Sequence, residues 1–118
     1  MAGPTSRSSC DALGKLLGTI VRPWTLHILW VFISQGPTRF GDLRRSVPGI
    51  SARVLTVRLR TLEAEGLVYR HRTANNPPEV IYGLTPRAVE IGALLEELQR
   101  AAARWDDDRT TRASPATG

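Results

Sequence analysis

Cysteine and long hydrophobic runs are both nearly absent from this chain of 118 residues. Its one cysteine, Cys10, excludes an internal disulfide and a clustered cysteine metal site, which leaves a free thiol or an intermolecular bond. The longest apolar run, at residues 28–33, is far too short to span a bilayer. Residues 1–9 lack the apolar segment of a signal peptide. We therefore expect a cytoplasmic protein that does not contact a membrane.

The sequence also lacks the motifs that support catalysis or hold a metal ion. It contains no glycine-rich phosphate loop and no strand-turn-helix motif with a nucleophilic serine. His27 and His71 have no second histidine, cysteine or carboxylate at the spacing of metal ligands. His27 lies inside an apolar segment, where we expect a buried, hydrogen-bonded residue. We predict that the protein is not an enzyme and that it needs neither a metal nor another cofactor.

Basic charge, by contrast, is concentrated in one segment. The net charge is +5, and only one of the sixteen basic residues is a lysine. Residues 39–72 hold eight arginines and three acidic residues, whereas the rest of the chain holds eight basic and eight acidic residues. A basic patch on an otherwise neutral domain indicates a phosphate-rich partner. A solvated surface rich in arginine would give the same count, so charge alone does not decide between the two.

The hydrophobic periodicity predicts one domain at residues 10–105, between a flexible N-terminal arm at residues 1–9 and a disordered tail at residues 106–118. Helical spacing predicts helices at residues 10–21, 24–35, 39–47, 52–65 and 86–105. Alternating spacing predicts two strands, at residues 67–72 and 79–84, joined by turn residues. The fold class is therefore mainly α with a small β-hairpin, in the order of a winged helix-turn-helix.

Helix ends and faces support this order. Thr38, Ser51 and Thr85 are suitable N-caps for the last three helices, and Gly66 follows the end of the fourth. The fourth helix has an apolar stripe that we expect to be buried: Leu55, Leu59 and Leu62. Its opposite face is polar and basic: Arg53, Thr56, Val57 and Arg60. Two short helices joined by a Pro-Gly turn, the second with such an outer face, are typical of a helix-turn-helix.

Several stretches, in this order and spacing, resemble the HxlR-type transcriptional regulators of bacteria and archaea. They are Cys10, Trp24 followed by LHIL, RFGDLRR from Arg39, PGISARVLTVRLRTLEAEGLVYR from Pro48, PPEVIYGLT from Pro77, and Trp105. The resemblance implies a homodimer in which the first and last helices pack across a two-fold axis. Each subunit would then present its fourth helix to a major groove of double-stranded DNA and its wing to an adjacent minor groove or backbone.

The resemblance also assigns roles to residues outside the fourth helix. It implies a dimer interface formed by apolar residues of the first and last helices: Leu13, Leu17, Leu94, Leu98 and Trp105. Some members of the family sense electrophiles or oxidants through a cysteine at the place of Cys10, which implies a response to thiol oxidation or to a small molecule. The alternative is that Cys10 is only a small buried hydrophobe at the dimer seam.

The chain departs from the family pattern in two places. Arg22 and Pro23 precede Trp24, where the family usually has Gly-Lys. In the wing, Glu79 and Ile81 stand where the family usually has a basic residue and a glutamate. Because a negative charge at Glu79 repels phosphate, we expect the wing to contribute less to DNA binding than the family pattern suggests.

Charge and geometry then predict the DNA contacts. We expect bases to be read by side chains of the fourth helix and its cap: Ser51, Arg53, Thr56, Val57 and Arg60. We expect phosphates to be contacted by the remaining arginines of the basic segment: Arg39, Arg44, Arg45, Arg58, Arg70 and Arg72. For each arginine the alternative is an ion pair within the protein. For Arg58 this is an equal alternative, with Glu63 or Asp42, and for Arg60 the partner would be Glu63 or Glu65. A rival hypothesis for the whole basic face is an interaction module that docks an acidic protein.

Overall fold

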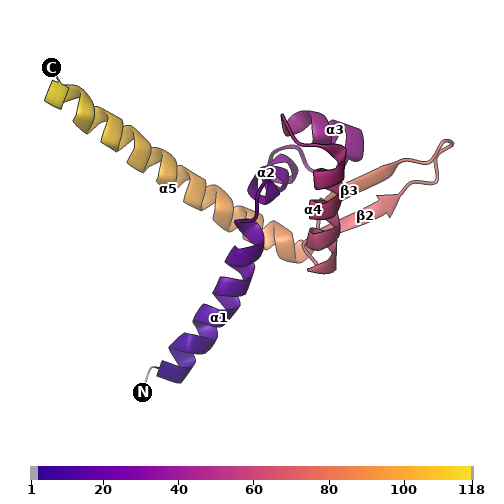
Figure 1. The fold of residues 1–118 in the computed structure, drawn as a ribbon, viewed down its shortest axis with the longest axis horizontal. Coiled ribbons are helices and arrows are strands. Elements are labelled where there is room, and N and C mark those ends of the chain that lie inside the picture. The colour runs from indigo at the N-terminus through magenta and orange to yellow at the C-terminus, as the bar shows by residue number, and fades with distance from the viewer. Residues whose placement is uncertain (1–2, 118) are drawn as a thin grey trace.

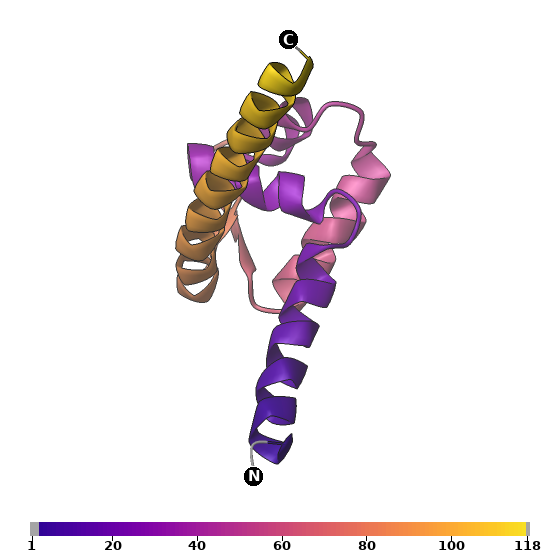
Figure 2. The same ribbon diagram turned by 90° about the vertical axis from the view of Figure 1, so that its left-hand side faces the viewer.

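The computed structural model describes residues 3–117, and it describes their side chains over residues 11–109. The described chain forms, in order, α1 (Gly3–Ile20), α2 (Thr25–Gln35), β1 (Thr38–Arg39), α3 (Phe40–Ser46), α4 (Ala52–Ala64), β2 (Val68–Arg72), β3 (Val80–Leu84) and α5 (Pro86–Thr117). α2, α3, α4 and the sheet form a body, from which α1 and α5 extend as two long arms (Figure 1). In the turned view the two arms point in opposite directions (Figure 2). The predicted mainly α fold class is confirmed.

The arms differ from the predicted helices in length. α1 begins at Gly3 and α5 continues to Thr117, beyond the boundaries at residues 10 and 105 that the sequence suggested for the domain. Where the folded domain ends stays a prediction.

The sheet has one strand more than the predicted hairpin. Its three strands are antiparallel in the order β1-β3-β2, and β2 pairs with β3 from Val68↔Leu84 to Arg72↔Val80. β1 adds to the other edge of β3, where Thr38 lies opposite Tyr82. The prediction that Thr38 caps α3 was therefore wrong: its hydroxyl donates to the Gly36 carbonyl at 2.8 Å, and Arg39 is the N-cap residue.

The core lies where α2, α3, α4 and β2 meet. Its side chains with at most 2% exposure are Ile28, Leu43, Val47, Leu55, Leu59, Leu62 and Val68, together with Thr25. The predicted stripe of α4 is thus buried, and its burial directs the opposite face of the helix to solvent. The prediction for His27 was wrong, because α2 faces the core with Thr25, Ile28, Leu29 and Phe32. This spacing leaves His27 exposed on the other side, beside the Trp24 ring.

α4 begins and ends as its sequence predicts. The Ser51 hydroxyl accepts a hydrogen bond from the Val54 amide at 3.1 Å, which satisfies one unpaired donor of the first turn. Gly66 follows the C-cap residue with φ 75°, a conformation that a residue with a Cβ adopts only at a cost. The Ser51 cap thus sets the start of α4 at Ala52, and Gly66 lies just after its end.

Two hydrogen bonds link α4 to the segment around the end of α1. The Arg58 Nε donates to the Pro23 carbonyl at 2.8 Å, in the turn between α1 and α2. The buried hydroxyl of Thr19, near the end of α1, donates to the Glu65 carboxylate at the C-cap of α4. The orientation of α4 is therefore coupled to that of α1.

Candidate nucleic-acid interface

The outer face of α4 brings together most of the residues predicted to read bases. The side chains of Arg53, Val57 and Arg60 are exposed. The other two predicted residues, Ser51 and Thr56, use their hydroxyl groups in hydrogen bonds to the backbone of α4. The Ser51 hydroxyl accepts from the Val54 amide, and the Thr56 hydroxyl donates to the Ala52 carbonyl at 2.8 Å. Thr56 therefore offers its methyl group rather than its hydroxyl proton to a ligand. Back-bonding of a helical threonine to the carbonyl four residues earlier is a local signal that could have been recognised in the sequence.

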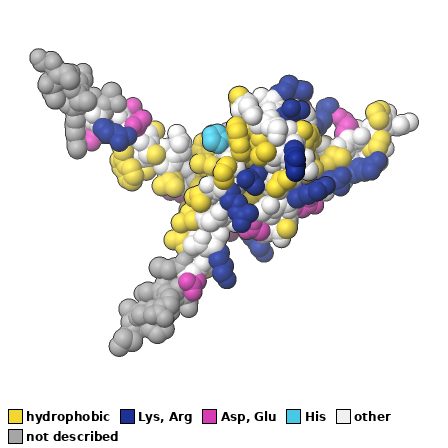
Figure 3. Space-filling view, in the orientation of Figure 1, with side chains coloured by type: hydrophobic (Ala, Val, Ile, Leu, Met, Phe, Trp, Pro, Cys, Tyr) yellow, Lys and Arg dark blue, Asp and Glu magenta, His cyan; other side chains and the backbone are white. Residues whose placement is uncertain are grey.

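The basic face extends from α4 over α3 and the hairpin. Figure 3 shows dark-blue side chains over α3 and α4 and along the length of the hairpin. Five of the exposed arginines of this face, which we call the open arginines, are Arg44, Arg53, Arg60, Arg70 and Arg72. Within the described residues none of the five has a carboxylate within 4.0 Å. Their charge is therefore available to an outside partner.

Three other arginines of the basic segment have partners inside the protein. Arg58 forms neither of the ion pairs weighed for it, because its Nε is bonded to the Pro23 carbonyl. Arg45 pairs with Asp42, an i, i+3 spacing that the sequence already contained. Arg39 pairs with Glu79, with 2.6 Å between the guanidinium nitrogen and the carboxylate oxygen. The last contact depends on the pairing of β1 with β3, which no local pattern indicated.

Both arms carry uncovered apolar side chains. The five residues predicted to form a dimer interface are all exposed: Leu13 55%, Leu17 45%, Leu94 61%, Leu98 59% and Trp105 68%. Apolar faces of this kind mark surfaces that associate with another molecule. Cys10, the predicted sensor, lies outside the residues whose side chains the structure describes.

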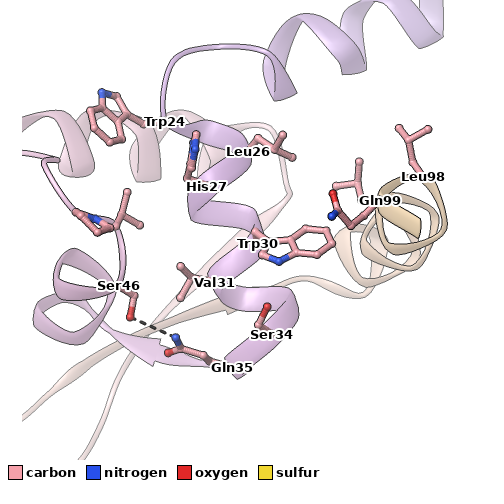
Figure 4. A pocket seen from close by; sticks show the side chains of 13 residues that line it. Trp24, Leu26, His27, Trp30, Val31, Ser34, Gln35, Ser46, Leu98 and Gln99 are labelled. Atoms are coloured by element: carbon pink, nitrogen blue, oxygen red, sulfur yellow. Dashed lines mark hydrogen bonds between the residues drawn. The ribbon is translucent and has the colours of Figure 1, made fainter. Parts of the chain in front are cut away.

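An apolar groove of about 760 Å³ lies between α2, the end of α3 and α5. Trp24, Leu26 and Trp30 form one wall, and Leu95 and Leu98 form the other. Figure 4 shows Trp30 pointing from α2 toward α5. Because Leu98 also belongs to the exposed stripe of α5, the groove and the stripe form one continuous apolar surface.

Neither a cluster of metal-ligating side chains nor a single membrane-spanning helix is present in the described part of the chain. No group of three or more His, Cys, Asp or Glu residues there could hold a metal ion. No single helix there has both the length and the apolar composition to cross a membrane. The segments Asp11–Ile20 and Thr25–Gln35 meet that test only as a pair, across a bend of 85°.

Two consecutive short helices with a basic outer face, followed by a β-hairpin whose strand β3 also pairs with β1, define a winged helix-turn-helix protein. The family described as HxlR-like helix-turn-helix matches residues 19–110. The chain belongs to this family.

Relatives and solved structures agree with the family. YvaP of Bacillus subtilis strain 168, an uncharacterised HTH-type transcriptional regulator, is 30% identical over 98 residues, which are 83% of this chain and 90% of YvaP. YodB, an HTH-type transcriptional regulator of the same strain, is 31% identical over 96 residues, 81% of this chain and 79% of YodB.

The structure of reduced YodB superposes with a TM-score of 0.72 at 30% identity, over 79% of this chain and 90% of that one. The redox regulator HypR in its oxidised form superposes with a TM-score of 0.68 at 31% identity, over 79% and 95%. The chain is thus an HTH-type transcriptional regulator, its relatives are regulators rather than enzymes, and the family implies DNA binding.

Proposed function

We propose that the protein is a cytoplasmic, sequence-specific transcriptional regulator that binds an inverted-repeat operator in double-stranded DNA as a homodimer. The observation that carries this proposal is the set of open arginines. They lie on one face of the molecule, together with the side of α4 that is turned to solvent. A phosphate-rich duplex supplies the charge that this face lacks. A protein-docking role has no comparable support, because no feature of the basic face selects an acidic protein over DNA.

α4 enters the major groove in this proposal. Arg53, in the first turn of the helix, donates two hydrogen bonds to O6 and N7 of a guanine, and Arg60 reaches a base or its phosphate further along. Val57 and the Thr56 methyl contact thymine methyl groups. Ser51 holds the first turn of α4 in place and lies beside the DNA backbone.

Phosphates are contacted by the open arginines outside α4. Arg44 on α3 and Arg70 and Arg72 on β2 flank the reading helix from two sides, so they fix its position without reading sequence. Arg58 acts differently, since its Nε bond to Pro23 holds α4 against the turn before α2.

The dimer in this proposal forms through the arms. Leu13 and Leu17 of α1 and Leu94, Leu98 and Trp105 of α5 are buried against the second copy. A two-fold dimer requires an operator with the same symmetry, with half-site centres about 10 base pairs apart or at a multiple of that distance.

DNase footprinting on the intergenic region beside the gene tests this function. We expect two protected half-sites related by a dyad, and competition by the operator that is far stronger than competition by random duplex. Equal binding to any duplex at about 0.15 M salt would refute sequence-specific regulation. Binding to an acidic protein but to no duplex would support the docking alternative.

Cys10 is the proposed redox sensor, with support from the relatives rather than from contacts in this chain. Solved structures include a diamide-treated YodB and the redox regulator HypR in oxidised form. We expect diamide to lower operator affinity, reductant to restore it, and Cys10→Ser to bind equally before and after treatment. Gel shifts of both proteins check this prediction, and a wild-type affinity that diamide leaves unchanged would contradict it.

A further inference from the structure

The contact between Arg39 and Glu79 joins the wing to the helix-turn-helix. Arg39 ends β1 and is the N-cap residue of α3, whereas Glu79 directly precedes β3. Their side chains approach to 2.6 Å although they are forty positions apart in the sequence, and they are 61% and 32% exposed. An isolated exposed ion pair contributes little stability, so the surroundings of Glu79 decide whether this pair is maintained.

Glu79 is held in place by the residues of the wing tip. The Thr73 amide donates to the Glu79 carbonyl at 2.8 Å, and the Glu79 amide donates to the Thr73 hydroxyl at 2.9 Å. The Asn75 side-chain amide donates to one carboxylate oxygen at 3.4 Å, while Arg39 contacts the other oxygen. The carboxylate is therefore oriented toward Arg39 before any ligand arrives.

Charge gives a physical reason for Arg39 to stay on Glu79 when DNA is near. Glu79 is the only acidic residue of the hairpin, residues 67–84, and the tip at residues 73–78 carries no charge. If Arg39 turned to a phosphate, it would leave the Glu79 carboxylate uncompensated close to the same backbone, and the repulsion would offset the attraction between Arg39 and that phosphate. Keeping the guanidinium on Glu79 avoids this repulsion.

We infer that Arg39 promotes DNA binding by neutralising and positioning Glu79, and that it does not itself contact a phosphate. The inference rests on the proposed DNA-binding function, and it separates Arg39 from Arg44, Arg70 and Arg72, with which the sequence grouped it as a phosphate contact. It makes Arg39 and Glu79 a positioning pair for the wing.

Glutamine substitutions distinguish an Arg39 that neutralises Glu79 from an Arg39 that contacts a phosphate. We expect Arg39→Gln to weaken operator binding about three- to tenfold, because it exposes the negative charge of Glu79. Arg39→Gln/Glu79→Gln should bind within about twofold of the wild type, because the repulsive charge is gone as well. Affinities are measured by fluorescence anisotropy over a series of salt concentrations. A double variant as weak as Arg39→Gln, with a salt slope lowered by about 0.9, would show a phosphate contact and overturn the inference.

Arg44→Gln is the matched control, since Arg44 is an exposed arginine of the same helix-turn-helix without a carboxylate partner in the described part of the chain. Arg44→Gln should lower the slope of log affinity against log salt concentration by about 0.9, and adding Glu79→Gln should not restore it.

Amide hydrogen exchange in the free protein tests the positioning role without DNA. We expect the Thr73 amide to exchange several-fold faster in Arg39→Gln, because the residue that accepts its hydrogen bond loses its fixed partner. An unchanged exchange rate would refute positioning. A wild-type protein that binds no duplex would refute the proposed function instead. The exchange experiment would still test whether Arg39 positions Glu79, because it uses the free protein.

Discussion

Replacing Leu94 and Leu98 together by glutamate is expected to produce a folded monomer that binds the operator about 10²- to 10⁴-fold more weakly than the wild type. The two side chains are one turn apart on α5 and are 61% and 59% exposed, so charge at these positions costs the isolated subunit little. In a dimer the same positions would be buried, and four uncompensated carboxylates would lie at the interface. Sedimentation velocity measures the association state, and gel shift measures the affinity.

The large loss of affinity follows from the geometry of a two-fold operator. In a dimer, binding of one subunit places the second subunit beside its half-site, which makes the second binding step intramolecular. A monomer has only the contacts of one α4 and one wing.

Arg100→Glu is the control for this variant. It changes the net charge by the same amount, lies on the same helix, and is exposed, but at about 100° per residue it points away from the side of Leu94 and Leu98. We expect Arg100→Glu to remain dimeric and to keep its affinity within a few-fold. A dimeric Leu94→Glu/Leu98→Glu variant would show that α5 does not form the interface.

Arg53→Ala is expected to lower affinity for the operator about 5- to 150-fold, which corresponds to about 1–3 kcal/mol for a bidentate guanine contact. Affinity for random duplex should change much less, because Arg53 reads a base in this proposal rather than only adding charge. The side chain is exposed and has no carboxylate partner in the described structure, so neither folding nor dimerisation should be affected.

Arg44→Ala provides the comparison for Arg53→Ala. A phosphate contact contributes equally to every sequence, so Arg44→Ala should weaken operator and random duplex by the same factor. Competition gel shifts with both duplexes measure the two ratios. If Arg53→Ala also weakens both duplexes equally, α4 does not read sequence through Arg53.

The fold was predictable wherever its information is local. Leu55, Leu59 and Leu62 repeat at helical spacing, and Ser51 and Gly66 have the side-chain chemistry that helix ends require, so the recognition helix could be placed with its faces assigned. β1 has only two residues and therefore no periodicity, so its pairing with β3 was not visible. His27 was misplaced because α2 is apolar on most of its sides, which hides the stripe that faces the core.

The candidate site was predictable in its charge but not in its internal contacts. The count of arginines located the basic face, and the spacing on α4 separated Arg53 and Arg60 from the core. The pair of Arg39 with Glu79 and the bond from Arg58 to Pro23 join residues 40 and 35 positions apart. Such contacts are set by tertiary packing, and only the three-dimensional structure shows them.

The hydrogen bonds from Thr19 to Glu65 and from Arg58 to Pro23 couple α4 to the end of α1 and to the turn after it. In a dimer built on the arms, the separation and relative twist of the two reading helices are then fixed by the protein and not adjusted to each target. One base pair added to the spacer turns a half-site by about 34–36° about the DNA axis, since a helical turn takes about 10–10.5 base pairs. The regulator would thus discriminate among promoters by spacer length as strictly as by the bases themselves.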